Sequence, residues 1–180
     1  MKMDPKYILK LAGTLFLITA LVAAALAGVN AITAPRIEAI NIQKTQEAVE
    51  LVLPGGGELL APGSYNDCGG KVAEVYASDA GYAVKVCPIG FDNTITMMVG
   101  VDLEGKVTAI TVISHTETAG LGAVAAAKTE AGERFRAQFV GQSGTLEVGD
   151  QITAISSATI TSKAVTEGVN IALQCVAGLG

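Results

Sequence analysis

The longest apolar stretch of the chain lies close to its N-terminus. No charged residue occurs between Leu11 and Pro35, and three lysines stand before this run, Lys2, Lys6 and Lys10. About 20 apolar residues in an α-helix cross the ~30 Å hydrocarbon core of a bilayer. The pattern predicts a single transmembrane helix over residues 11–35. By the positive-inside rule, residues 1–10 are cytoplasmic and the following domain lies outside the cytoplasmic (inner) membrane.

A cleaved signal peptide is the alternative explanation of this run. Signal peptides have an apolar core of about 7–15 residues that ends at a small-residue cleavage site. The alanine-rich residues 23–27 keep this alternative open. The observed run is longer than such a core, which favours a retained membrane anchor.

Apolar periodicity after the anchor divides the rest of the chain. Pro35 is suited to the start of a new helix, and apolar spacing predicts an amphipathic helix as far as Leu53, within a juxtamembrane helix and loop at 36–70. Alternating positions predict antiparallel strands at 71–77, 81–87, 94–102 and 106–114. Residues 122–140 and 163–176 have helical spacing, and 145–148 and 151–155 are short strand candidates. The domain at 71–180 is therefore expected to be α+β, with flanking helices.

Composition and charge exclude some classes of partner and site. The net charge of −5, with no tryptophan among 180 residues, argues against a nucleic-acid partner, which requires basic surface and stacking platforms. The three cysteines show no metal-site spacing. Cys68 and Cys87 are candidates for a pair outside the membrane, and Cys175 is expected to be a small buried residue.

One segment is unusually rich in hydroxyl groups, with five in the seven residues 156–162. The helical spacing that follows places Val165, Val169 and Val176 on one apolar face. Thr161 or Ser162 is the expected N-cap of this helix, and a helix N-terminus with free N–H groups is suited to binding phosphate. An ordinary capped helix after a Ser/Thr turn is the alternative interpretation.

A second candidate segment, residues 115–122, follows the strand with the clearest alternation. It contains His115, the single histidine of the sequence, and Glu117 two residues later. Two such residues supply too few ligands for a metal site, so a solvated surface histidine is the expected state of His115. Gly120 and Gly122 allow positive φ or a close approach of the backbone to a ligand.

Both segments resemble motifs of one protein family. Residues 156–162 resemble the Ser-Gly-Ala-Thr-x-Thr-Ser motif of the FMN-binding domain found in the G subunit of Rnf complexes and in the C subunit of the sodium-translocating NADH:quinone reductase, with Ser157 in place of Gly. Residues 115–122 resemble the family's His-x-Glu-Thr-Pro-Gly-Leu-Gly loop, with Ala119 in place of Pro. Residues 90–95 resemble its Gly-Phe-Gly-Gly loop, with Asp92 and Asn93 in place of the glycines.

The resemblance implies that FMN is attached to Thr159 as a phosphoester by a flavin transferase. Thr153 stands where the transferase recognition sequence usually begins with Asp. The phosphate is expected beside the rest of the motif, namely Ser156, Ser157, Ala158, Thr161, Ser162 and Lys163. The flavin ring is expected beside the other loop, namely His115, Glu117, Thr118, Gly120, Leu121 and Gly122. No metal site and no catalytic side chain are expected, because the redox chemistry belongs to the cofactor.

The resemblance further implies an electron-relay subunit within an ion-translocating oxidoreductase, with polytopic membrane subunits and iron–sulfur subunits as partners. The chain is short and its soluble domain has no obvious insertions, which favours the Rnf branch over the quinone-reductase branch. A stand-alone membrane-anchored flavin module is the second hypothesis. An exported hydrolase that uses His115 with a serine is the third, but the sequence contains no Gly-x-Ser-x-Gly elbow.

Overall fold

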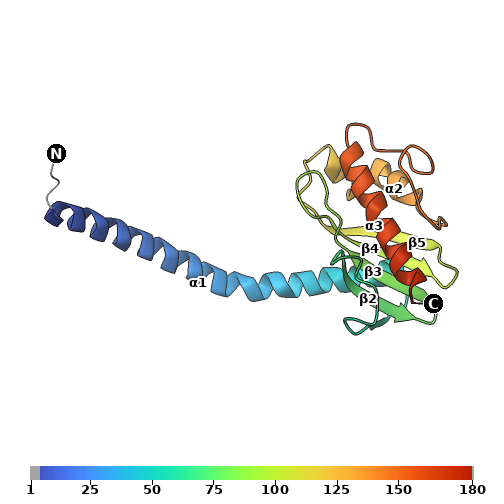
Figure 1. Ribbon diagram of the computed structural model, residues 1–180, viewed down its shortest axis with the longest axis horizontal. Coiled ribbons are helices and arrows are strands. Elements are labelled where there is room, and N and C mark those ends of the chain that lie inside the picture. The colour runs from blue at the N-terminus through green and yellow to red at the C-terminus, as the bar shows by residue number, and fades with distance from the viewer. Residues whose placement is uncertain (1–4, 180) are drawn as a thin grey trace. The chain divides into compact units, whose positions relative to one another are not determined.

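The structure is a computed structural model that describes residues 5–179, and it divides into two compact units at Gln43 and Lys44 (Figure 1). The N-terminal unit consists of the helix α1, which runs from Pro5 to Val52 and continues into the second unit. Lys2 of the predicted cytoplasmic end lies outside the described residues. The orientation inferred from the lysines therefore stays a prediction.

The expectation that a new helix begins at Pro35 is wrong, because Pro35 lies inside α1. Proline removes one backbone donor from a helix, but the residues on both sides of Pro35 are helical. Membrane-spanning helices tolerate a proline where the freed backbone groups find other partners. By length and composition, α1 is the one described helix that could cross a membrane. Its large apolar side chains before Pro35, including Leu15, Phe16 and Leu21, are exposed in the N-terminal unit.

The second unit is built on an antiparallel sheet with the strand order β1-β2-β3-β4-β5. The four predicted strands are confirmed to within two residues at each end, as β2 (Val72–Ser78), β3 (Gly81–Val86), β4 (Thr96–Asp102) and β5 (Val107–Ser114). The edge strand β1 (Glu58–Leu59) was not predicted, because two residues are too few to show alternation. The α+β class is confirmed.

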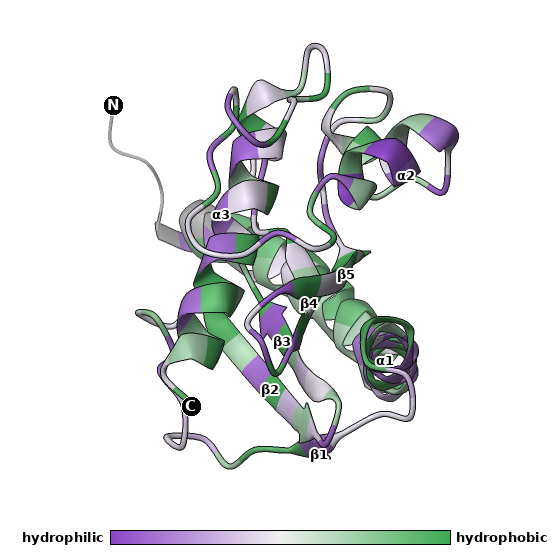
Figure 2. Cartoon of the chain, turned by 90° about the vertical axis from the view of Figure 1, so that its right-hand side faces the viewer, coloured by the Kyte–Doolittle hydropathy of each residue, from purple (hydrophilic) through white to green (hydrophobic). Residues whose placement is uncertain are grey.

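Helices cover both faces of this sheet (Figure 2). Val84, Val99 and their neighbours on one face form the main core with α3 (Thr159–Ala177). Ala83 and Met98, which alternate with them, pack on the other face against Ala48, Val49 and Val52 at the end of α1. Side chains of consecutive strand residues point to opposite faces, so both faces of the central strands β3 and β4 are apolar.

The other predicted elements differ in extent from the observed ones. The helix expected at 122–140 is two pieces, the 3₁₀ turn η1 (Gly122–Ala125) and α2 (Glu130–Ala137). The break occurs because Thr129 caps α2 by accepting a hydrogen bond from the Gly132 N–H. The two short strands expected at 145–148 and 151–155 are reduced to one parallel bridge between Val148 and Ile152.

Candidate functional site

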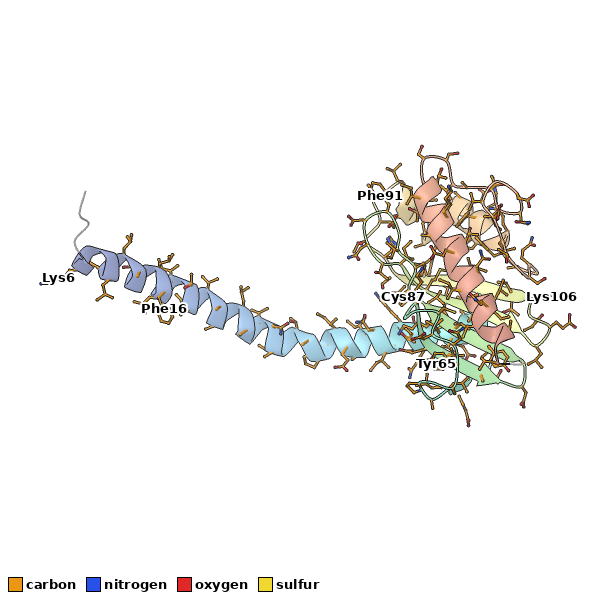
Figure 3. The ribbon with its side chains drawn as sticks, in the orientation of Figure 1. Lys6, Phe16, Tyr65, Cys87, Phe91 and Lys106 are labelled. Atoms are coloured by element: carbon orange, nitrogen blue, oxygen red, sulfur yellow. The ribbon has the colours of Figure 1, made fainter. Side chains whose placement is uncertain are left out.

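A pocket of about 310 Å³ brings the two sequence motifs together. Its walls come from three segments that are far apart in the chain, the 88–95 loop, the 115–122 loop and the start of α3. The lining residues are Phe91, Glu117, Thr118, Leu121, Gly122, Ser157, Ala158, Thr159, Ile160 and Thr161. Figure 3 shows Phe91 beside the first turn of α3. The volume lies at the lower end of the range for small-molecule sites.

The expected N-cap of α3 at Thr161 or Ser162 is wrong. The helix begins at Thr159, and its N-cap, Ala158, offers no side-chain bond. Ser162 instead holds the preceding turn, because its hydroxyl accepts from Ile155 N–H at 3.0 Å and donates to the Ala158 carbonyl at 2.9 Å. A hydroxyl in the first turn that bonds to the carbonyl four residues earlier is compatible with the helix, so the helix starts before these residues.

The first turn of α3 presents its backbone donors and the exposed Thr159 side chain to the pocket. The first N–H groups of any helix lack partners inside the helix, and no side chain caps them here. Ser157, just before the helix, has a φ of 66°, a left-handed conformation that glycine adopts at no steric cost. The residue that replaces the family glycine is therefore strained.

Glu117 is buried at the junction of the three segments. Its Oε1 accepts from Phe91 N–H at 2.9 Å and from Asp92 N–H at 3.2 Å, and its Oε2 accepts from the Thr161 hydroxyl. A Cβ on either Gly90 or Gly122 would collide with the carboxylate. The backbone at Gly122 thus lies close to Glu117, and the expected close approach to a ligand stays a prediction.

Several predicted site residues lie outside this pocket. Gly120 has the expected positive φ and is exposed, as is Lys163, and neither lines the pocket. Ser156 lines a different cavity, of about 650 Å³, beside Gln138 and Thr153. The expectation of a solvated His115 is wrong, because His115 is partly buried and its Nδ1 is fully buried without a partner in the described structure.

The sequence-based site omitted two apolar residues. Phe91 and Ile160 both line the pocket although each side chain is more than half exposed. The signal for Phe91 was present in the resemblance of residues 90–95 to the Gly-Phe-Gly-Gly loop. Ile160 stands at the variable position of the hydroxyl-rich motif, where the motif itself carries no information.

Among the described residues, the cysteines and acidic side chains form neither a disulfide nor a metal site. Cys68, Cys87 and Cys175 are all free, so the suggested pairing of Cys68 with Cys87 is not found. Cys175 is buried as expected, and burial raises the pKa of its thiol to about 11. Among residues 5–179, no group of three His, Cys, Asp or Glu side chains is arranged to hold a metal ion.

Comparison with known proteins gives similarities over both parts of the chain. Residues 90–174 match the model of the FMN-binding domain, and residues 1–52 match that of the RnfG N-terminal region. The G subunit of the Na⁺-translocating ferredoxin:NAD⁺ oxidoreductase complex of Acetobacterium woodii is 34% identical, covering 96% of this chain and 93% of the relative. The G subunit of the ion-translocating oxidoreductase complex of Methanosarcina acetivorans is 28% identical, covering 96% of each. The G subunit of the proton-translocating ferredoxin:NAD⁺ oxidoreductase complex of Clostridium ljungdahlii is 36% identical, covering 62% and 64%.

Proposed function

Because the chain belongs to the family of G subunits of Rnf-type ion-translocating oxidoreductase complexes, we propose that it is a membrane-anchored flavoprotein subunit that relays electrons through a covalently bound FMN. The match of residues 1–52 to the RnfG N-terminal region favours this assignment over the C subunit of the sodium-translocating NADH:quinone reductase. Membrane and iron–sulfur subunits of the complex are the proposed partners. The FMN-binding domain match over residues 90–174 supports the choice of cofactor.

The pocket has walls that suit a flavin. Phe91, Leu121 and Ile160 offer exposed apolar side chains from three segments, as the ring system of a flavin requires. When bound, FMN supplies the electron chemistry. These apolar side chains would hold the ring and shield part of it from water.

Thr159 is the proposed attachment residue, and the single observation that carries the proposal is its position. Thr159 is the first residue of α3, it lines the pocket, and its side chain is exposed. Thr161, in contrast, is buried and donates its hydroxyl hydrogen to Glu117. A phosphate on Thr159 lies at the helix N-terminus, where the free N–H groups and the positive end of the helix dipole stabilise its charge. Lys163, one turn later and exposed, can add a positive charge.

Attachment requires a flavin transferase that reaches residues 153–159 on the outer side of the membrane. Support for this orientation comes from the lysines before the uncharged part of α1. A reporter that is active only outside the cytoplasm, fused to the C-terminus, is expected to be active. Activity of a cytoplasmic reporter at the same place would contradict this orientation.

The proposed function is tested by mass spectrometry and in-gel flavin fluorescence on the full chain, co-expressed with a flavin transferase. Thr159→Val keeps the branched side chain but removes the oxygen, so the covalent flavin should be lost while the fold remains. Thr118→Val is the matched control, because Thr118 is another exposed threonine of the pocket wall. It should retain the flavin. Thr159→Ser keeps the hydroxyl oxygen and should retain the covalent flavin where the transferase accepts serine. A Thr159→Val protein that still carries covalent FMN would refute the assignment.

A further inference from the structure

Glu117 is a buried carboxylate on the wall of the proposed flavin pocket. The residue is 7% exposed, and it lines the pocket beside Thr161. All of its described donors are neutral, namely two backbone N–H groups and one hydroxyl. Within residues 5–179, no ion pair involves Glu117. Its negative charge is therefore hydrogen-bonded but not neutralised by a cation.

The titratable groups around Glu117 leave this charge uncompensated. The 88–95 loop contributes Asp92, which is exposed and itself acidic, and the 115–122 loop contributes the partly buried His115. The start of α3 contributes Lys163, whose side chain is exposed. The turn η1 contains no titratable side chain. Charges on exposed groups are screened by water, whereas a charge in a site of lower permittivity acts more strongly on its neighbours.

We propose that Glu117 is a fixed negative charge that lowers the reduction potential of the flavin while its hydrogen bonds position Phe91 against the flavin ring. The inference rests on the proposed function. Reduction of FMN by two electrons from a chemical reductant, with one proton taken from water, leaves one additional negative charge on the flavin, and no bond to the protein forms or breaks. Repulsion between this charge and the Glu117 carboxylate makes reduction less favourable.

The hydrogen bonds of Glu117 also order the pocket. Oε1 binds the adjacent N–H groups of Phe91 and Asp92, and Oε2 binds the first turn of α3 through Thr161. One carboxylate thus connects the loop that carries the aromatic wall to the helix that carries the proposed attachment residue. The carboxylate lies in close contact with the backbone at Gly90 and Gly122, where a Cβ would collide with it.

Glu117→Gln separates the charge from the hydrogen bonds. The amide oxygen can accept from the Phe91 and Asp92 N–H groups, and the amide nitrogen can donate to the Thr161 oxygen. We expect the flavin-loaded Glu117→Gln protein to shift the equilibrium between oxidised and reduced flavin at least tenfold toward the reduced form. For a two-electron couple this is a rise of about 30 mV in midpoint potential.

Asp92→Asn is the matched control, because it makes the same change of acid to amide on an exposed side chain of the same loop. We expect less than a threefold shift in that equilibrium. The inference is overturned when Glu117→Gln shifts the equilibrium by less than threefold, or when Asp92→Asn shifts it as much as Glu117→Gln. A parent protein that carries no covalent flavin would instead overturn the proposed function.

Thr161→Val gives a second test that does not depend on the folding of Glu117→Gln. The substitution removes the hydroxyl that donates to the Glu117 carboxylate and leaves the carboxylate charge in place. The midpoint potential of the flavin, measured at pH 8, should therefore fall or stay unchanged. A rise equal to that expected for Glu117→Gln would contradict the inference.

Amide hydrogen exchange in the flavin-free protein tests the positioning role of Glu117 separately. The backbone amides of Phe91 and Asp92 should stay protected from exchange in Glu117→Gln and lose this protection in Glu117→Leu. Equal protection in both variants would show that Glu117 does not position Phe91.

Discussion

Gln138 binds the backbone of Thr153 through both polar atoms of its side-chain amide. Its Oε1 accepts from Thr153 N–H at 2.8 Å, and its Nε2 donates to the Thr153 carbonyl at 3.2 Å. These are the two kinds of bond that a neighbouring strand would make. The segment that leads into the hydroxyl-rich motif is therefore held in place by the C-cap residue of α2.

Replacing Gln138 with Leu should destabilise the domain by about 1–2 kcal/mol, because the two hydrogen bonds to Thr153 are lost and each contributes roughly 1 kcal/mol. Urea unfolding of the flavin-free protein measures this change. Gln174→Leu is the control, because Gln174 is exposed on α3 and its side chain makes no hydrogen bond within residues 5–179. Equal stability of the Gln138→Leu and parent proteins would mean that water replaces both bonds without cost.

Ser157→Gly should stabilise the protein by about 1 kcal/mol. Ser157 has a φ of 66°, and a left-handed conformation costs a residue with a Cβ roughly 1–2 kcal/mol relative to glycine. Ser156→Gly is the control, since Ser156 is not among the residues with positive φ. Glycine there adds only freedom to the unfolded chain and should destabilise the protein. Chemical denaturation of both variants checks the opposite signs.

The sheet could be predicted from the sequence because its central strands alternate between two faces that are covered by different helices. Ala83 and Val84 illustrate this, since they are adjacent in β3 and belong to different clusters of the core. The segment at 151–155 has the same kind of pattern, yet it forms no strand. The partner of Thr153 is a side chain, Gln138, and a pattern along one segment carries no information about such a partner.

The site could be predicted in part, because each of its three segments resembles a motif of the family. The hydrogen bonds of Glu117 could not be derived, since their partners Phe91 and Thr161 are 26 and 44 residues away. The start of α3 was misplaced for a related reason. Thr161 and Ser162 look like caps when the helix is considered alone, but their hydroxyls are bound to Glu117 and to the Ile155–Ala158 turn.

The free energy of unfolding should fall at acid pH, because the Glu74 carboxyl group takes up a proton there. Burial tends to raise the pKa of Glu74, but the hydrogen bonds from Tyr76 and Lys85 and the positive charge of Lys85 lower it overall. A carboxyl group whose pKa is lower in the folded state contributes stability above its unfolded pKa, near 4.5, and this contribution is lost as the pH falls through the folded value. The free energy of unfolding, measured in urea from pH 6 to pH 3, should therefore decrease below about pH 4.5.

Glu74→Gln should flatten that acid limb, because the amide has no proton to bind over this range. Glu58→Gln, at an exposed position in β1, is the control and should keep the acid limb of the parent. A Glu74→Gln profile that is parallel to the parent profile would show that other carboxyl groups cause the acid loss of stability.

Gly100→Ala should destabilise the packing between β4 and the end of α1 by about 1–3 kcal/mol. A Cβ at this position would collide with the Val52 carbonyl and the Thr108 hydroxyl, which are themselves hydrogen-bonded at 3.0 Å. Thermal unfolding of the parent and variant measures the change. Adding Thr108→Ala should restore part of the loss but not all of it, because the Val52 backbone remains. Full recovery of the stability would show that the new Cβ collides with the Thr108 hydroxyl alone.

Phe91→Ala should weaken the contact between the protein and the flavin without affecting the flavin-free fold. The Phe91 side chain is 66% exposed while its backbone N–H is bound by Glu117, so the side chain contributes little to the stability of the domain alone. With FMN on Thr159, it is expected to pack against the flavin ring, and an aromatic contact of this kind contributes roughly 0.5–1.5 kcal/mol. The measurement is the difference in free energy of unfolding between flavin-loaded and flavin-free protein. Phe91→Ala should reduce this difference by that amount.

Leu103→Ala is the control for Phe91→Ala, because Leu103 is 65% exposed but lies in the turn between β4 and β5, outside the pocket. It should leave the difference between loaded and flavin-free protein unchanged. Collisional quenching of flavin fluorescence by iodide gives a second readout, which should increase in Phe91→Ala and not in Leu103→Ala, since removal of one wall exposes the ring to solvent. Equal quenching in both variants and in the parent would mean that the ring lies away from Phe91, against Leu121 and Ile160 alone.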